Sequence, residues 1–533
     1  MRNAAEILPH AFVARVRSSD VRQPTRAAIV LLAFMIFLLY LLSSSWRFPL
    51  GGDGRATLAT SRSLLTHQTL AVDAEFASDE GFAPRAKIGV DGRAYAKAGL
   101  GLPIVEMPFV AVALGISRVA AVPEAQALAA ILSLLNPLLT ACTVIAVFRL
   151  CRSMDCPAPA ALSMAVAYSF GTLAWVYAGV DGTEPLQALC LVLALLFLLK
   201  YRSERLATSL SASGFALAFA VVTKPADAVL VPAFGLYVIA VLRAQRLSLR
   251  QAAPALAHFI SPLAICFLFL VWLNWIRFGS VLETGYEHDA FRNHFSSGIY
   301  GLVFSFNKGI IFYSPLVLLA PVGIGLMARA HREEAAMIVL ASLSYVSLFA
   351  KYAFWGAGWA WGPRYLVPIL PLLMVPVARA VDTARVWRYL GAGLFVAGFL
   401  VNGVGVLIDG DAYHSAIMNV DLTEQTGSVQ VGSVRYPGQL VEMAIPPDYV
   451  LPEFSEIVGK LWLAGVAWDG CSCHEHTAEC GCRSGAMEKD ARFSSPPWAK
   501  RYPDVHALAP YGSRLINPWI VNRIHQSFAS RSR

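Results

Sequence analysis

Two aspartates, Asp53 and Asp181, stand in short glycine-containing segments that follow hydrophobic stretches of the sequence. Each could be an ordinary turn residue, because Asp-Gly is a common turn dipeptide and aspartate often caps the next helix. Each could also do chemistry, since one carboxylate can take a proton from a hydroxyl while another positions a substrate or a divalent metal. We expect both to face one cavity if the intervening helices bring them together.

Three basic residues, Lys97, Lys224 and Arg364, lie close to the ends of hydrophobic stretches. A lysine there can extend its ammonium group from the membrane to the water, which is an ordinary role. A cation at this position can also bind a phosphate group. The sequence therefore predicts either interfacial anchors or contacts to an anionic donor substrate.

Polar and aromatic side chains gather in two further loops, where they predict contacts to a sugar or to an acceptor: Glu283, Tyr286 and His288 in one, Trp359 and Trp361 in the other. Tryptophans are common in the aromatic belt at membrane interfaces. Flat aromatic rings can equally stack on sugars. Both interpretations remain open from sequence.

Four cysteines form a dense cluster near the C-terminus: Cys471, Cys473, Cys480 and Cys482. In an oxidising compartment such a group is typical of disulfides. A zinc-like site of thiolates with the nearby histidines is the alternative, although the spacing matches no common zinc module. The other five cysteines are scattered, and we expect them to be reduced.

The elements that position these residues are predicted to be membrane-spanning helices. The chain has 533 residues, of which 56% are hydrophobic and only 15% charged, whereas soluble proteins carry about 25% charged residues. Eleven apolar stretches approach the length that crosses a bilayer, at 27–45, 125–147, 158–178, 184–199, 206–222, 226–242, 255–277, 311–328, 335–352, 364–380 and 388–408. The sequence thus predicts an all-α polytopic membrane protein.

Basic residues alternate from loop to loop along this chain, with eighteen in the inner segments and six in the short outer segments, when the long polar segment 46–100 is left out of the count. The positive-inside rule then places the N-terminus in the cytoplasm and the C-terminus outside. The same rule explains the net charge of +8 without nucleic-acid binding. Leu100–Ile116 would invert this pattern as a span, so we expect a helix that lies at the outer membrane surface or re-enters the membrane there.

The predicted domains follow from these spans. Residues 1–26 form a cytoplasmic leader, and residues 27–408 form the transmembrane domain. Within that domain, residues 46–124 form a long first outer loop with interfacial helices. Residues 409–533 form a polar extracytoplasmic region.

Four stretches together resemble the type-C glycosyltransferases, the superfamily of bacterial aminoarabinose transferases and protein O-mannosyltransferases. They are Gly52-Asp53-Gly54 with Ser61-Arg62-Ser63-Leu64; Lys97 to Pro108; Asn274 to Tyr286 with Asn307 to Pro315; and Trp359 to Tyr365. The resemblance covers roughly residues 27–408. One departure is Gly54, where many relatives have a glutamate.

The resemblance implies a GT-C fold in the bacterial inner membrane, a polyprenyl-phosphate-linked sugar as donor, and inversion at the anomeric carbon. It implies Asp53 as catalytic base supported by Asp181, and Lys97, Lys224 and Arg364 as phosphate contacts. The acceptor would be an envelope glycan, a glycolipid or a protein. A divalent metal is possible, and no other cofactor is indicated. A transporter or flippase of a polar or lipid-linked substrate is the main alternative, and an assembly factor is another.

Overall fold

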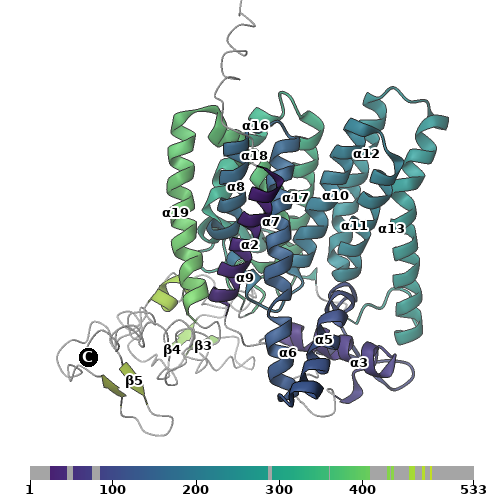
Figure 1. The fold of residues 1–533 in the computed structure, drawn as a ribbon, viewed down its shortest axis with the longest axis vertical. Helices are drawn as coiled ribbons and strands as arrows, with labels where there is room; N and C mark the ends of the chain where they lie inside the picture. Colours follow the sequence, from purple (N-terminus) through teal and green to yellow (C-terminus); the bar gives the residue numbers. More distant parts are fainter. Residues whose placement is uncertain are drawn as a thin grey trace, which may run out of the picture.

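The structure is a computed structural model of the whole chain, and it describes residues 25–44, 52–74, 85–285, 291–358, 360–408, 429–431, 434–436, 455–461, 471–473 and 480–482. Most of these residues are helical. The described part of residues 25–408 is a bundle of long helices that run roughly side by side (Figure 1). The all-α fold class predicted from the sequence is therefore confirmed.

The long helices of the bundle are α2 (Arg26–Ser43), α7 (Leu135–Ser153), α8 (Ala158–Gly171), α10 (Glu184–Glu204), α11 (Ala207–Thr223), α12 (Val231–Ala244), α13 (Leu249–Phe278), α17 (Arg332–Lys351), α18 (Leu370–Thr383) and α19 (Arg385–Leu407). Shorter helices complete or connect them: α9 (Ala174–Ala178), α14 (Phe295–Phe304), α15 (Ile310–Tyr313) and α16 (Ala320–Met327), with the 3-10 helices η3 (Pro225–Leu230), η5 (Pro315–Leu319) and η6 (Arg364–Ile369).

Nine helical segments of the described residues are long and apolar enough to cross a membrane. Eight of them coincide with predicted spans, and the ninth is Gly101–Ala120. The predicted spans at 158–178, 206–222 and 311–328 correspond instead to the shorter apolar helices Ala158–Gly171, Ala207–Thr223 and Pro315–Met327. The count of eleven spans stays a prediction, because length and composition alone do not decide which short helices cross.

The bundle has a buried centre and a periphery suited to lipid. Leu191, Val192 and Ala194 of α10 are fully buried, so this helix lies in the centre. On α13, at one side of the bundle in Figure 1, Ile265 and Phe267 are exposed. A helix that leaves large apolar side chains uncovered can do so at no cost where lipid tails replace water.

The remaining elements of this part of the chain gather at one end of the bundle, at the bottom of Figure 1. They are α3 (Gly52–His67), α5 (Gly101–Ala120), α6 (Glu124–Leu132) and a hairpin of β1 (Ala86–Ile88) with β2 (Ala94–Ala96). The hairpin is antiparallel, with Ala86 opposite Ala96. Helix α5 is the stretch predicted at the membrane surface; although its composition would allow a span, it lies with α3 and α6 at this end.

The described parts of the C-terminal region are short. Residues 456–461 are helical, and two antiparallel pairs are formed by β3 (Val429–Val431) with β4 (Val434–Tyr436) and by β5 (Cys471–Cys473) with β6 (Cys480–Cys482). The backbone register of the second pair sets Cys471 opposite Cys482, and Cys473 opposite Cys480. This register favours two cross-strand bridges, because directly opposed Cα atoms are within disulfide range.

Mass spectrometry of unreduced protein is expected to find Cys471 linked to Cys482 and Cys473 linked to Cys480, with no free thiol among the four. Stoichiometric zinc bound to four free thiols would contradict this prediction in favour of a metal site. The five scattered cysteines are free in the structure, which matches the expectation.

Candidate active site

Asp53 lies in the first turn of α3 and faces Arg364 at the start of η6. Asp53 Oδ2 is 2.5 Å from Arg364 Nη2, which makes a charge-assisted hydrogen bond across 311 residues of sequence. The helix N-terminus also favours a carboxylate. The side chain of Asp53 remains 59% exposed, so a substrate can reach it.

The surroundings of Asp53 keep it ionised. The Arg364 guanidinium lowers the pKa of the Asp53 carboxyl from its ordinary value, an effect that outweighs the opposing effect of burial, with smaller contributions from Lys224 and Arg85. A lowered pKa means that the carboxylate persists as the pH falls. Asp53 is thus available as a base throughout the neutral range, although Arg364 weakens its basicity while the pair is intact.

A second acid, Glu184, lies between the two partly buried cations, Lys224 and Arg364. Its Oε1 is 3.6 Å from Arg364 Nε and 3.6 Å from Lys224 Nζ. The ammonium of Lys224 also lies 4.5 Å from the ring centroid of Tyr365, a cation–π contact. These contacts hold Arg364 and Lys224 beside each other, so that their two positive charges lie together at the end of the bundle that carries α3.

Asp181 comes from the loop between α9 and α10, and it lies against the first turn of α3. A Cβ atom at Gly54 would be only 1.7 Å from Asp181 Oδ2. Asp181 therefore packs one residue away from Asp53. The loop is held by Asn136 Nδ2, which donates hydrogen bonds to the carbonyl oxygens of Val180 and Gly182.

A buried glutamate ties α3 to α5 beneath these aspartates. Glu106 is 2% exposed; it accepts a 2.7 Å hydrogen bond from Ser61 and a 3.3 Å one from Thr57. The Thr57 hydroxyl is also 2.9 Å from the carbonyl oxygen of Gly54. Glu106, the polar residue that interrupts the apolar stretch in the sequence, thus helps to position the turn that carries Asp53.

Lys97 and Arg85 flank the open end of the β1–β2 hairpin. The amide of Lys97 donates to the carbonyl of Arg85 at 2.9 Å. Gly99, two residues further on, packs so closely on the backbone of Thr223 that a Cβ would lie 2.3 Å from its carbonyl oxygen. The backbone after Lys97 is therefore held against the end of α11, next to Lys224 in the sequence, while the Lys97 side chain lies near Gly285.

The other predicted contacts have different positions. Tyr286, His288 and Trp359 lie outside the described residues. Glu283 is used within the fold, because its carboxylate is 2.7 Å from Lys87 Nζ and accepts from the amide of Gly285. A role for Glu283 as a sugar contact stays a prediction.

Trp361 does not form an exposed stacking surface. It is 5% exposed, its ring meets Tyr313 edge to face at 5.0 Å, and the Lys460 ammonium lies 4.5 Å from its centroid. A sugar could stack on it only by displacing Lys460. The ring thus packs inside the protein in this structure, and a role for Trp361 as a sugar contact stays a prediction.

Sequence reasoning missed Arg85 and Glu184 as members of the site. Arg85 lies in a polar segment without a motif, and Glu184 looks like an ordinary first-turn acid of α10. Among the described residues no group of three histidines, cysteines, aspartates or glutamates is arranged to hold a metal. The possible divalent metal stays a prediction, and so do the roles of the other residues.

Replacing Gly54 with alanine is expected to reduce activity strongly while leaving α3 intact. The new methyl group would meet Asp181 Oδ2 at 1.7 Å and Asp181 Cβ at 2.8 Å, so Asp181 must move, whereas alanine favours a helix. Turnover by purified protein measures the loss. Gly115→Ala on α5, where nothing lies within 4 Å, is the control. Equal activities would contradict the tight packing of Asp181 on Gly54.

Comparison with known proteins finds a likeness to two solved structures of ArnT from Cupriavidus metallidurans. The structure bound to undecaprenyl phosphate has a TM-score of 0.45 and 14% identity, covering 84% of this chain and 72% of that chain. The apo structure has a TM-score of 0.44 and 13% identity, covering 86% and 72%. No family model matches the sequence, and no curated protein matches it. Both likenesses concern the fold alone.

Proposed function

We propose that the protein is a membrane glycosyltransferase that moves a sugar from a polyprenyl-phosphate donor to an acceptor outside the cytoplasm, with inversion. Asp53 is the general base, and Asp181 supports it. Arg364, Lys224 and Lys97, together with Arg85, contact the donor phosphate. The proposal follows the family resemblance of the sequence and is supported by the geometry of the charged residues.

The observation that carries the proposal is the pairing of an accessible carboxylate with partly buried cations at one end of a membrane bundle. Asp53 is hydrogen-bonded to Arg364, and Lys224 lies beside Arg364 through Glu184. A carboxylate can accept a hydroxyl proton, and cations stabilise a departing phosphate. Transfer of a sugar from a lipid phosphate needs a base for the acceptor hydroxyl and cations for the phosphate. The two must lie no further apart than the length of one sugar.

The proposed reaction is a single displacement. The acceptor hydroxyl oxygen attacks the anomeric carbon from the face opposite the phosphate, and Asp53 takes its proton. The bond between the anomeric carbon and the phosphate oxygen breaks, and its electron pair leaves with the polyprenyl phosphate. Arg364 and Lys224 then face the charge that develops on this phosphate, so their stabilisation increases along the reaction.

Donor binding also activates the base in this scheme. In the free protein, Arg364 is engaged with Asp53 and lowers its pKa. A phosphate that binds between Arg364 and Lys224 competes for the guanidinium, which weakens the Asp53–Arg364 pair. The basicity of Asp53 then rises when a sugar is in place, which limits proton transfer to the productive complex.

The membrane setting suits a lipid-linked donor. The helices supply apolar surfaces for a polyprenyl chain, while the charged residues lie at the end where the bundle meets water. The positive-inside bias of the sequence puts this end outside the cytoplasm, in the bacterial inner membrane. An envelope glycan, a glycolipid or a protein could reach it from there.

The test is release of polyprenyl phosphate by purified protein from a panel of lipid-linked sugars, each supplied with envelope glycan, glycolipid and protein acceptors. Release that depends on acceptor, with the sugar recovered on the acceptor as the opposite anomer, is expected. A flippase or transporter would move the intact donor across vesicles without releasing polyprenyl phosphate. Movement of the intact donor, together with no release of polyprenyl phosphate from any donor, would contradict the assignment as a glycosyltransferase.

A further inference from the structure

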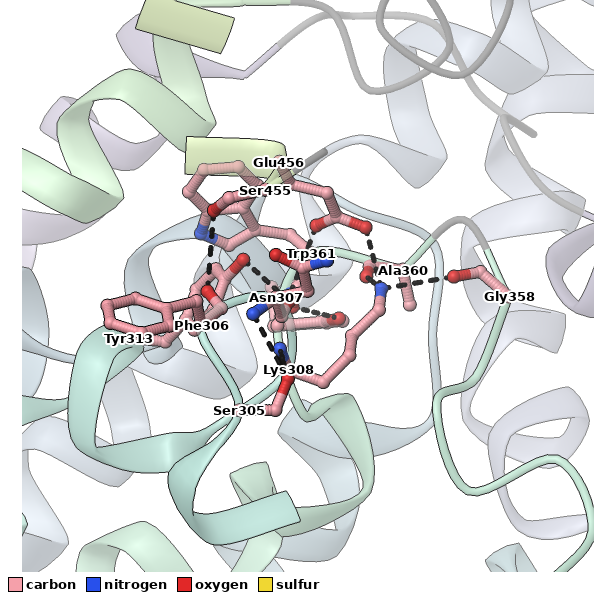
Figure 2. A network of polar contacts seen from close by, with 12 residues as sticks. Ser305, Phe306, Asn307, Lys308, Tyr313, Gly358, Ala360, Trp361, Ser455 and Glu456 are labelled. Carbon is pink, nitrogen blue, oxygen red and sulfur yellow. Dashed lines mark hydrogen bonds and ion pairs between the residues drawn. The ribbon is translucent and has the colours of Figure 1, made fainter. Parts of the chain in front are cut away.

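A buried ion pair joins the C-terminal region to the membrane bundle (Figure 2). Lys308 Nζ is 2.6 Å from Glu456 Oε1, and the two side chains are 0% and 5% exposed. The ammonium also donates to the carbonyl oxygens of Gly358, at 3.1 Å, and Ala360. Lys308 thus connects the docked segment, residues 455–461, to the tryptophan loop, residues 355–364, of which residue 359 is outside the described part.

Burying two charges is costly unless attraction and hydrogen bonds compensate for the lost water. Here the compensation is extensive, since Lys308 has three oxygen partners and Glu456 Oε2 also accepts from the amide of Gly362 at 3.4 Å. An ion pair with this many fixed partners specifies one geometry. The pair therefore defines how the tryptophan loop lies.

Further contacts hold the docked segment in place. The Ser455 hydroxyl lies 3.4 Å from the carbonyl oxygen of Phe306. Lys460 donates to the carbonyl oxygens of Gly405 and Ile408 at the end of α19, and its ammonium covers the ring of Trp361. The segment is thus attached to three separate parts of the bundle, one of which is the tryptophan loop.

The loop leads directly to the active-site arginine. The amide of Arg364 donates to the carbonyl oxygen of Gly362 at 3.0 Å, and the Tyr177 hydroxyl donates to the carbonyl oxygen of Trp361 at 2.9 Å. Gly362 has a φ of +59°, a conformation that favours glycine. Glu456 contacts the amide of Gly362, and Gly362 is hydrogen-bonded to Arg364. A displacement of Glu456 would therefore shift the backbone that carries Arg364.

We propose that the docked segment is a clamp on the tryptophan loop, and that Glu456 and Lys308 are positioning residues that hold Arg364 against Asp53. This inference rests on the proposed function for its kinetic consequences. A segment near residue 456 thereby completes a site whose other members lie between residues 53 and 364. Loss of the clamp lets Arg364 leave Asp53 and the donor phosphate.

The first measurement is hydrogen exchange of the tryptophan loop in full-length protein in lipid nanodiscs. Glu456→Gln keeps the shape but removes the negative charge that Lys308 contacts at 2.6 Å, so exchange of amides at 360–364 is expected to rise about 10-fold or more. The control is Glu124→Gln, which breaks the exposed Arg62–Glu124 pair of 3.0 Å and should leave the loop unchanged. Equal exchange in both variants would overturn the clamp.

The second measurement is the pH profile of kcat/KM for a lipid-linked sugar. Glu456→Gln should raise the donor KM about 10-fold and move the acid limb to higher pH, because Arg364 no longer lowers the pKa of Asp53. The double variant Lys308→Met/Glu456→Leu removes both buried charges, which preserves folding better than either single change. It should show the same rise in donor KM and the same shift of the acid limb, since the carbonyl oxygens of Gly358 and Ala360 no longer accept hydrogen bonds from Lys308.

The outcomes separate the two proposals. Faster exchange together with a shifted acid limb supports the positioning role. Faster exchange with an unmoved acid limb and donor KM rejects it, because the clamp would then be structural only. Wild-type protein that releases no polyprenyl phosphate rejects the proposed function, and the exchange comparison still decides whether the docked segment holds the loop.

Discussion

Replacing Asp53 with asparagine is expected to slow sugar transfer to a hydroxyl acceptor by about 100-fold or more. Asparagine has the same shape but cannot take the proton. Because the change also releases Arg364 from its partner, the guanidinium becomes more available to the donor phosphate. The loss should therefore appear in kcat, with an unchanged or lower donor KM. Single-turnover kinetics with a lipid-linked sugar measure both.

The matched control is Asp155→Asn. Asp155 is an exposed aspartate whose Oδ2 is 3.2 Å from His331 Nε2, in the loop before α8 rather than near α3. Its φ of +58° suits asparagine well, so this variant should transfer sugar at the wild-type rate. A similar loss in both variants would point to a general effect of lost charge on folding or insertion.

An Asp53→Asn protein that inserts correctly and works at the wild-type rate would remove Asp53 as the base. An acceptor that is already anionic, such as a phosphate, needs no base. Repeating the assay with hydroxyl and phosphate acceptors distinguishes the two cases. If the variant transfers sugar only to a phosphate acceptor, the proposed site stands and the reaction needs no proton transfer. If it also transfers sugar to a hydroxyl acceptor at the wild-type rate, another group is the base.

The fold was accessible from sequence because hydrophobic length is a strong signal. Each of the eleven predicted spans contains a helix, and α10 begins at the predicted residue, Glu184. The boundaries were less predictable, and α8 ends at Gly171 rather than 178. Thr172 is extended there, and its hydroxyl bonds back to Tyr168. The hydropathy of the sequence does not indicate such a break within an apolar stretch.

The site was only partly accessible. Asp53 and Asp181 were chosen because both follow helices that the charge pattern predicts to run outward, and Gly54 lies against Asp181 in the structure. Arg85 was missed, because its position depends on the register of a three-residue hairpin. That pairing and the packing of Gly99 and Gly101 on α11 bring its charge toward Asp53.

The Lys308–Glu456 pair could not be predicted, since 148 residues separate its members and a lone glutamate in a polar region carries no signal. Trp361 illustrates the same limit from the opposite side. As a tryptophan in a loop between predicted spans it suggested an interfacial or sugar-binding ring, whereas Tyr313, Gly405 and Lys460 surround it in the structure. Contacts between residues far apart in the sequence decide whether such a side chain is buried. The pattern of neighbouring residues does not reveal those contacts.

Replacing Arg364 with glutamine is expected to lower kcat/KM for the donor about 10- to 100-fold, the loss that follows removal of a charged hydrogen-bond partner. Arg364 Nη2 binds Asp53 and its Nε lies 3.6 Å from Glu184. Lysine has one nitrogen and cannot reproduce this two-sided arrangement, so Arg364→Lys should recover little activity. Arg243→Gln, an exposed arginine in the last turn of α12, is the control.

The pH dependence makes the test of Arg364 specific. Arg364 lowers the pKa of the Asp53 carboxyl, so the wild-type base stays ionised until the pH falls below the ordinary range of aspartate. Without Arg364 the carboxyl takes up its proton at a higher pH, and the acid limb of kcat/KM must move upward. In wild type, the acid limb of kcat should lie above that of kcat/KM, because bound phosphate draws Arg364 away from Asp53. If Arg364→Gln lowers activity equally at every pH, Arg364 does not tune Asp53, and its role is confined to the donor phosphate.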